Sequence, residues 1–285
     1  MSIADEKKQE LDVLIQGKQT NYMYKHTDIS HYMGDIISEA IREKHFYMVY
    51  QPQFALGSGK LLGFEALIRC QSPDFGLVSP ADFIPFAEEN GEIVEIGKWI
   101  FRQALLDLKT LRDKGLDDIY MSVNLSPAQF AAGDVFEQVM VLLMEFNLPP
   151  TALKLELTET ALIRNAEVAA RTFRAFQNEG VQIWLDDFGT GFASLNLLRE
   201  FKIDGLKIDK SFIDGIHRND DDFTICSAII AMAQRLGLHV VAEGIEDEMQ
   251  AQILGQLGCD AAQGFLLARP QAIAQCIESW VPKAT

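Results

Sequence analysis

Residues 205–243, GLKIDKSFIDGIHRNDDDFTICSAIIAMAQRLGLHVVAE, carry the pattern that decides the fold. The segments Gly205–Asp209 and His239–Glu243 are short and rich in β-forming residues, and each ends in an acidic residue. Between them, Phe223–Leu236 has apolar residues at helical spacing. A helix that connects two such strands is typical of a parallel β-α-β unit.

The same alternation extends through most of the chain. Eight strands are predicted, at Phe46–Phe54, Leu62–Arg69, Tyr120–Leu125, Leu153–Thr158, Gln182–Asp186, Gly205–Asp209, His239–Glu243 and Ala261–Phe265. Helical patterns separate most of them, at Val94–Leu111, Val135–Phe146, Ala161–Asn178, Phe223–Leu236 and Glu248–Leu257. Eight strands in about 240 residues predict an α/β protein with a TIM-like (β/α)8 barrel. An open, doubly wound sheet is the alternative that this pattern leaves.

The beginning of the barrel should be irregular. A five-residue Gly-rich link, Leu56–Lys60, joins the first two strands and leaves no room for a helix, which predicts that the first strand is antiparallel. No linker rich in Pro, Gly or Ser interrupts Phe46–Pro270, so residues 41–285 are expected to form one domain, large enough for an enzyme. Residues 1–40 are polar, and we expect them to be a helical or loose lead-in segment.

Composition and charge limit the classes of function. Of 285 residues, 41 are Asp or Glu and 25 are Lys or Arg, and the resulting net charge of −16 disfavours binding to duplex nucleic acid. Widely spaced cysteines without a CxxC pair predict reduced thiols rather than a zinc site. They are Cys70, Cys226, Cys259 and Cys276. The polar residues 1–8 and the shortness of every apolar run predict a cytoplasmic protein that does not insert into a membrane.

Polar residues lie on or just after almost every predicted strand. They are Glu65, Asn124, Glu156, Asp186 with Asp187, Lys207 with Asp209, Glu243 and Gln263. In a barrel the ends of the strands converge on one mouth, which is where such enzymes carry their chemistry. Side chains alternate along a strand, so Lys207 and Asp209 share one face while Leu206 and Ile208 share the other.

These residue types predict a metal site. The carboxylates Glu65, Glu156, Asp186 and Asp187 would repel one another unless cations lay between them. Oxygen ligands without His or Cys select Mg²⁺ or Mn²⁺ over Zn²⁺. Two divalent ions about 3.5–4 Å apart would neutralise four carboxylates, and Lys207 would then leave the mouth slightly positive. Such a site attracts a phosphodiester and suits in-line attack by water on phosphorus.

Simpler interpretations exist for single residues. A lone acid at a strand end often caps a helix, and Asp186-Asp187 before Phe188-Gly189 is also typical of a turn. The five histidines form no metal-binding spacing and are expected to be ordinary surface or packing residues. Agreement among seven strand ends favours a shared site.

At these residues the chain resembles the EAL-domain phosphodiesterases, which hydrolyse the bacterial second messenger cyclic di-GMP. The resemblance covers about residues 41–280 and rests on an ordered series of motifs. They are Tyr50-Gln-Pro52, Glu65-Ala-Leu67 with Arg69, Ser79-Pro80, Phe83-Ile84, Asn124-Leu-Ser126, Glu156-Leu-Thr-Glu159, Asp186-Asp-Phe-Gly-Thr-Gly191, Lys207-Ile-Asp209, Val241-Ala-Glu-Gly-Ile-Glu246 and Gln263-Gly264. The series implies cleavage of cyclic di-GMP to linear pGpG with two Mg²⁺ or Mn²⁺ ions, and a homodimer.

The resemblance also implies a role for each matching residue. The metal ligands would be Glu65, Asn124, Glu156, Asp186, Asp187 and Glu246, with Asp186 bridging the two ions. Lys207 would contact the attacking water, Glu243 would be its general base, and Glu65 would complete the catalytic set. Substrate would be bound by Gln51, Arg69, Asp209 and Gln263. Glu159 would stabilise the loop Asp187–Leu195, which in this family links the metal site to the dimer interface.

Departures from the family pattern spare the ligands. Cys70 stands where Trp is usual, and Phe192-Ala193 replace the commoner Tyr-Ser, which affects the loop rather than the chemistry. Two alternatives stay open at this point. One is a catalytically silent cyclic di-GMP receptor that signals through a partner bound by residues 1–40. The other is a Mg²⁺-dependent barrel enzyme that abstracts a proton with Lys207 as the base.

Overall fold

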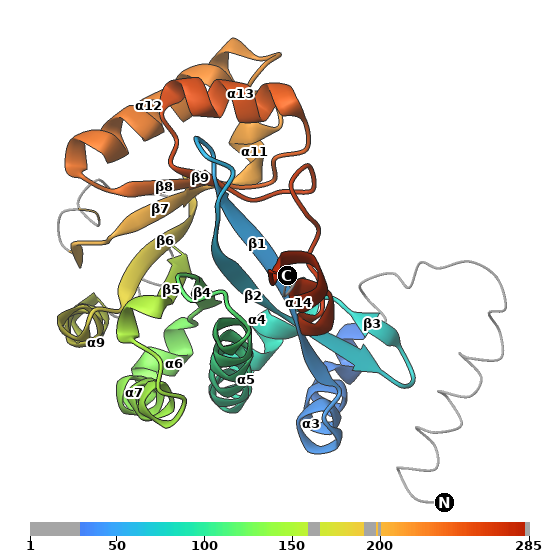
Figure 1. Cartoon of the computed structure of the whole chain (residues 1–285). Coiled ribbons are helices and arrows are strands. Elements are labelled where there is room, and N and C mark those ends of the chain that lie inside the picture. Colours follow the sequence, from blue (N-terminus) through green and yellow to red (C-terminus); the bar gives the residue numbers. More distant parts are fainter. Residues whose placement is uncertain (1–28, 159–165, 191–197, 199–200, 283–285) are drawn as a thin grey trace, which may run out of the picture.

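The computed structural model describes residues 29–158, 166–190, 198 and 201–282. Its centre is a closed barrel, which Figure 1 shows as a ring of strands with helices outside it. The barrel strands are β1 (Phe46–Ala55), β2 (Leu61–Ser72), β4 (Tyr120–Asn124), β5 (Leu153–Thr158), β6 (Gln182–Phe188), β7 (Gly205–Ile208), β8 (His239–Ala242) and β9 (Ala261–Ala262). Their order is β1-β9-β8-β7-β6-β5-β4-β2, and pairing of β1 with β2 closes the ring. The TIM-like barrel is therefore confirmed, and the open sheet is wrong.

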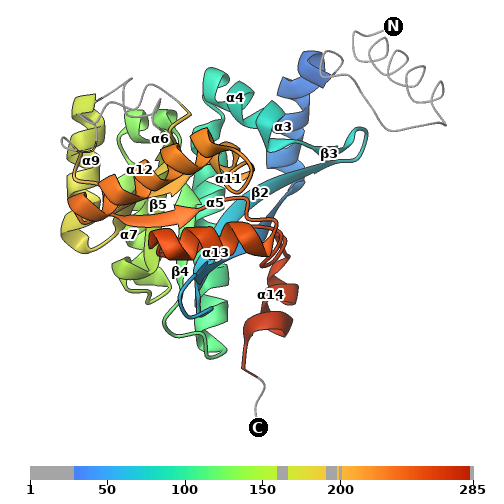
Figure 2. The same ribbon diagram turned by 90° about the horizontal axis from the view of Figure 1, so that it is seen from above.

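The first strand is antiparallel, as the short link predicted. β1 pairs antiparallel with both β2 and β9, whereas the other neighbouring barrel strands are parallel. In the β1–β2 register Gln51 lies opposite Glu65, so both side chains lie on the same face of the sheet. A small strand, β3 (Gly76–Val78), extends β2 as a hairpin beside the helix that precedes β1 (Figures 1 and 2).

Helices cover the outside of the barrel (Figure 2). They are η1 (Ser30–Tyr32), α3 (Met33–Glu43), α4 (Pro80–Asn90), α5 (Ile93–Asp113), α6 (Pro127–Ala132), α7 (Val135–Glu145), η2 (Pro150–Ala152), α9 (Ala166–Glu179), α11 (Lys210–Ile213), α12 (Asp220–Leu236), α13 (Glu248–Leu257) and α14 (Ile273–Trp280). Four of the five predicted helices agree with α5, α7, α12 and α13 to within three residues at each end. The fifth agrees with α9 from residue 166 onward; residues 161–165 lie outside the described part of the chain.

Two separate apolar clusters stabilise the barrel. The larger lies between the strands and the surrounding helices and includes buried leucines of α5 and β5. The smaller lies inside the barrel floor and contains Trp184, Val241 and Ala261. Gly205 makes room for the indole ring, because a Cβ at this position would lie 2.7 Å from Trp184. The amine of Lys154 completes the floor, 3.5 Å from the ring centroid of Tyr120 and 3.9 Å from that of Trp184.

Helix α3 packs against the larger apolar cluster. It extends past residue 40, the predicted end of the lead-in segment. It buries Met33, Ile36, Ile37 and Ala40. Residues 1–28 lie outside the described part, so the lead-in segment stays a prediction. All four cysteines are free and buried. Among the residues that the structure describes, no helix is long and apolar enough to cross a bilayer.

A buried hydrogen bond joins β1 to α5 and provides a stability test. Tyr50 is fully buried, and its hydroxyl donates to Asp107, which is also buried. We expect Tyr50→Phe to lower the free energy of unfolding by about 1–3 kcal/mol, because the carboxylate loses a donor that water cannot replace. Urea titration measures the change. Tyr47→Phe, on the exposed side of the same strand, should change stability by less than about 0.5 kcal/mol. Equal effects of the two variants would contradict the assignment.

Candidate active site

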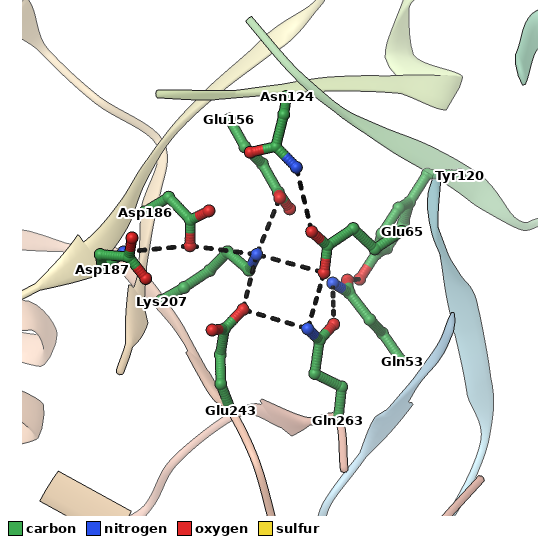
Figure 3. A network of polar contacts seen from close by, with 10 residues as sticks. All are labelled: Gln53, Glu65, Tyr120, Asn124, Glu156, Asp186, Asp187, Lys207, Glu243 and Gln263. Atoms are coloured by element: carbon green, nitrogen blue, oxygen red, sulfur yellow. Dashed lines mark hydrogen bonds and ion pairs between the residues drawn. The ribbon is translucent and has the colours of Figure 1, made fainter. Parts of the chain in front are cut away.

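Seven strands deliver polar side chains to one end of the barrel interior (Figure 3). Most of these residues occupy inward-facing positions at or just beyond the carboxyl end of a parallel strand, where the sequence predicted them. They are Glu65, Asn124, Glu156, Asp186, Lys207, Glu243 and Gln263. The predicted convergence is therefore present in the structure.

Lys207 occupies the centre of this group and is 1% exposed. Its ammonium nitrogen, Nζ, lies 2.6 Å from Glu243 Oε1 and 2.8 Å from Glu156 Oε2. It also lies 3.1 Å from Asp186 Oδ1 and 3.3 Å from Glu65 Oε2. One ammonium thus faces four carboxylates, which leaves the group strongly negative when all are ionised.

Two amide side chains complete the hydrogen bonding. Asn124 Nδ2 donates to Glu65 Oε1 over 3.0 Å. Gln263 Nε2 donates to Glu65 Oε2 over 2.7 Å and to Glu243 Oε1 over 3.0 Å. Glu65 therefore accepts hydrogen bonds on both oxygens, which holds its carboxylate in one orientation.

The excess of negative charge raises the pKa of several carboxyl groups. Burial, with repulsion from Glu65 and Asp186, raises the pKa of Glu156 to about 8 despite the attraction of Lys207. Burial and the neighbouring Asp186 raise the pKa of Asp187 to about 6. Burial also raises the pKa of Glu243 well above its ordinary value.

Two groups at the site are instead held in their charged forms. Burial alone would raise the pKa of Glu65, but Lys207 and the two amide donors lower it below its ordinary value. Although burial opposes the charge of Lys207, its four carboxylate neighbours raise its pKa well above the ordinary value, so it stays protonated. A lysine in this state is a hydrogen-bond donor and a poor base.

The carboxylates form two triplets that fit divalent cations. One consists of Glu65, Glu156 and Asp186, and the other of Asp186, Asp187 and Glu243. In each triplet, one oxygen per residue lies within 4.8 Å of the others. Asp186 belongs to both, as expected of a ligand that bridges two ions. An all-oxygen donor set with unbalanced negative charge matches Mg²⁺ or Mn²⁺.

A local irregularity places Asp187 beside Asp186. Consecutive strand residues normally point to opposite faces of a sheet. Here the β6–β7 register shifts between Leu185 and Phe188, and Asp187 adopts a φ of 53°. Aspartate tolerates this left-handed conformation better than most residues. The irregularity therefore allows the carboxylates of Asp186 and Asp187 to lie in the same triplet with Glu243.

The remaining predicted residues lie around this centre. Gln51 lies opposite Glu65 on β1, and Arg69 is partly buried with Nη1 donating to the Ile68 carbonyl over 2.8 Å. Asp209 caps α11 by accepting from Ser211 N over 3.0 Å. Glu246 lies outside both triplets and forms an ion pair of 2.5 Å with Lys210. Glu159 and residues 191–195 of its loop lie outside the described residues.

Two site residues were missed by the sequence reasoning. Gln53 donates through Nε2 to Gln263 Oε1, and Tyr120 donates through its hydroxyl to Gln53 Oε1, both over 2.7 Å. Gln53 was detectable in principle, since it shares the alternating face of Gln51. Tyr120 gave no such signal, because an aromatic residue at a strand start is usually interpreted as packing.

A cavity of about 230 Å³ has Glu156, one of the site carboxylates, in its wall. Arg69 and Asn124 contribute to its wall, together with apolar side chains of α4 and α5 such as Ile84 and Ile100. A combination of apolar wall and a few polar groups is typical of a small-molecule site.

A TIM-like barrel with one antiparallel strand and a mouth whose carboxylates could hold metal ions places the chain in the class of α/β barrel proteins. The EAL domain family model matches residues 35–270, and the chain belongs to the EAL domain family.

Similar proteins agree with this assignment. The chain is 42% identical over 235 residues to the signaling protein YkoW of Bacillus subtilis, covering 82% of this chain and 29% of YkoW. It is 38% identical over 244 residues to the cyclic di-GMP phosphodiesterase PdeR of Escherichia coli, covering 86% of this chain and 36% of PdeR. A solved structure described as PaMucR phosphodiesterase in complex with c-di-GMP superposes with a TM-score of 0.81 at 38% identity, covering 85% of this chain and 98% of the other. The chain spans about a third of the length of the curated relatives.

Proposed function

We propose that this chain hydrolyses cyclic di-GMP to linear pGpG with two Mg²⁺ or Mn²⁺ ions. The observation that supports this most directly is the pair of carboxylate triplets that share Asp186 around the buried Lys207. Membership of the EAL family and similarity to a phosphodiesterase bound to c-di-GMP support the choice of substrate.

The proposed metal ligands are drawn mainly from the two triplets, except that Glu243 of the second triplet is proposed as the general base. Glu65, Asn124, Glu156 and Asp186 would hold the first ion, with Asp186 and Asp187 holding the second. When bound, the two ions neutralise the carboxylates and polarise the oxygens of the phosphodiester and of water. Glu246 is proposed to join the second site, which requires release of its ion pair with Lys210.

The chain's own groups then orient the attack. Lys207 is a permanent donor and is proposed to hold the attacking water by a hydrogen bond. Glu243, 2.6 Å from that ammonium, is placed to accept the proton that the water loses. The new P–O bond forms as one ester P–O bond breaks, and the released 3′ oxygen takes up a proton to give pGpG.

Substrate recognition is proposed for residues around the mouth. Arg69 is the cation beside the cavity and would contact a phosphate. Gln51, across from Glu65, would contact a guanine edge, and Asp209 and Gln263 complete the predicted set.

Metal removal tests the proposal. We expect EDTA to abolish conversion of cyclic di-GMP to pGpG and added Mg²⁺ or Mn²⁺ to restore it, as resolved by HPLC against pGpG and GMP standards. Glu65→Gln should lose activity even with excess metal, because it removes one ligand charge. Undiminished turnover in EDTA would contradict the mechanism. Binding of cyclic di-GMP without pGpG formation would instead favour the silent receptor.

The proton-abstraction alternative finds less support. A base must be deprotonated at the working pH, whereas in the metal-free chain the four neighbouring carboxylates raise the pKa of Lys207 well above its ordinary value.

A homodimer, a regulatory partner that binds residues 1–40 and a cytoplasmic location are also proposed, from the resemblance and composition. Light scattering of the full chain with and without cyclic di-GMP tests the homodimer.

A further inference from the structure

A chain of directed hydrogen bonds runs from the barrel floor to the carboxylates (Figure 3). The Tyr120 hydroxyl donates to Gln53 Oε1, and Gln53 Nε2 donates to Gln263 Oε1. Gln263 Nε2 then donates to both Glu65 and Glu243. Each of the three side chains therefore donates a hydrogen bond to the next group in the series.

The direction of this chain follows from its two ends. An amide has a donor nitrogen and an acceptor oxygen, so reversing one amide reverses the next. If Gln263 were reversed, its carbonyl oxygen would face the oxygen of Glu65, which is held in its charged form and offers no hydrogen. If Gln53 alone were reversed, its carbonyl oxygen would face the carbonyl oxygen of Gln263 with no hydrogen between them, although its NH₂ group could still donate to the Tyr120 hydroxyl. The hydroxyl of Tyr120 can serve as the terminal donor and completes the only fully satisfied order.

Tyr120 is held in place by groups that do not belong to the carboxylate site. A Cβ at Gly63 would lie 2.5 Å from Cδ2 of the tyrosine ring, so glycine on β2 is what permits this ring position. Lys154 lies on β5, and its amine is 3.5 Å from the centroid of the Tyr120 ring. The two amides are closely packed as well, since Gln53 is 1% exposed and Gln263 5%. The hydrogen bonds from Tyr120 through Gln53 to Gln263 thus connect the closely packed floor of the barrel to the carboxylates at its mouth.

We propose that Tyr120 and Gln53 are positioning residues that keep the NH₂ group of Gln263 directed at Glu65 and Glu243. This inference rests on the proposed phosphodiesterase function. Once cations occupy the carboxylate oxygens, those oxygens constrain Gln263 less, and the Tyr120–Gln53 chain is what still holds its amide. A carboxylate ligand and the proposed base would then keep their relative orientation through one shared donor.

Tyr120→Phe removes one hydroxyl and leaves the ring against Gly63 and Lys154. We expect kcat for cyclic di-GMP to fall by about 10- to 100-fold, the range for outer groups that orient metal ligands, while KM changes by less than about twofold. Calorimetry with Mn²⁺ alone should show weaker binding. Gln53→Leu should have a similar effect, and the double variant should be no worse than the more affected single variant, because both interrupt one chain.

Tyr50→Phe is the matched control, because it also removes a tyrosine hydroxyl from a buried bond but outside the barrel interior. It should lower thermal stability and leave kcat and Mn²⁺ affinity unchanged. Unchanged kcat and Mn²⁺ affinity in Tyr120→Phe would overturn the proposal. Multiplicative effects of Tyr120→Phe and Gln53→Leu would also overturn it.

Failure of the proposed function would be visible separately. If the wild-type chain bound Mn²⁺ but released no pGpG, the phosphodiesterase assignment would fall. The positioning role would then be judged by Mn²⁺ affinity and by the side-chain amide NMR signals of Gln263 in the metal-free protein. A changed chemical shift and faster solvent exchange of that NH₂ group in Tyr120→Phe would support the role, and an unchanged amide signal would refute it.

Discussion

Asp186→Asn is expected to reduce cyclic di-GMP hydrolysis by at least about 10³-fold, equivalent to about 4 kcal/mol of transition-state stabilisation. Asp186 is the residue that both carboxylate triplets contain, so one substitution removes a charge from both proposed ion sites. An amide can still accept a hydrogen bond, but it binds hard cations less strongly than a carboxylate. HPLC of product formation at saturating Mg²⁺ measures the loss.

Metal titration distinguishes a shared ligand from a general loss of charge. Calorimetry with Mn²⁺ should show that Asp186→Asn weakens both binding events. Asp113→Asn, on the surface and paired with Lys109, should alter neither binding event nor activity. Weakening of only one event, with activity within tenfold of wild type, would contradict the bridging role.

Lys207→Met is expected to destabilise the metal-free protein by about 3–5 kcal/mol, since it leaves three buried carboxylates and the partly buried Glu243 without their central cation. Activity should also be lost, because the proposed water-orienting donor is absent. Mg²⁺ should restore part of the stability, since an ion that binds only the folded state stabilises it. The rise in Tm with Mg²⁺ should therefore exceed that of the wild type.

The loss of folding stability in Lys207→Met should depend on pH and should be larger at high pH than at low pH. The pKa values of Glu156 and Glu243 are already raised by burial although Lys207 lowers them, so removal of Lys207 should raise both further and make the folded state bind protons more readily than the unfolded chain. Stability of the variant should accordingly rise as pH falls toward the unfolded pKa values and be lowest in alkaline solution. Lys109→Met, on the surface, is the control. A variant as stable as wild type at pH 9 without metal would contradict this account.

Much of the fold was predictable because its signals are local. A buried parallel strand must be apolar, and a helix that covers it must be amphipathic. The unit around Phe223–Leu236 shows both patterns, and α12 is observed at Asp220–Leu236. Three of the helices that were not predicted have weak signals. Helix α4 contains Pro85, whereas α6 and α11 have only six and four residues.

The site was partly predictable for a different reason. Strand alternation and the convergence of strand ends are geometric consequences of a barrel, so the acids on β2, β5 and β6 could be assigned to one mouth. Alternation puts Gln53 on the same face as Gln51, but the hydrogen-bond partners of Gln53 could not be assigned this way. It lies on the reversed strand β1, and its partners Gln263 and Tyr120 are 210 and 67 residues away in the chain.

The sequence by itself determined the order of strands and helices, the reversed first strand and the set of oxygen-bearing side chains at the mouth, because each depends on spacing within a short segment. Only the tertiary structure decided which of those side chains meet. It centred Lys207 among four carboxylates, joined Asp187 to Asp186 through a bulge in β6, and left Glu246 paired with Lys210. Such contacts depend on distances of a few ångströms between segments far apart in the chain, and these distances are set by the closing of the barrel.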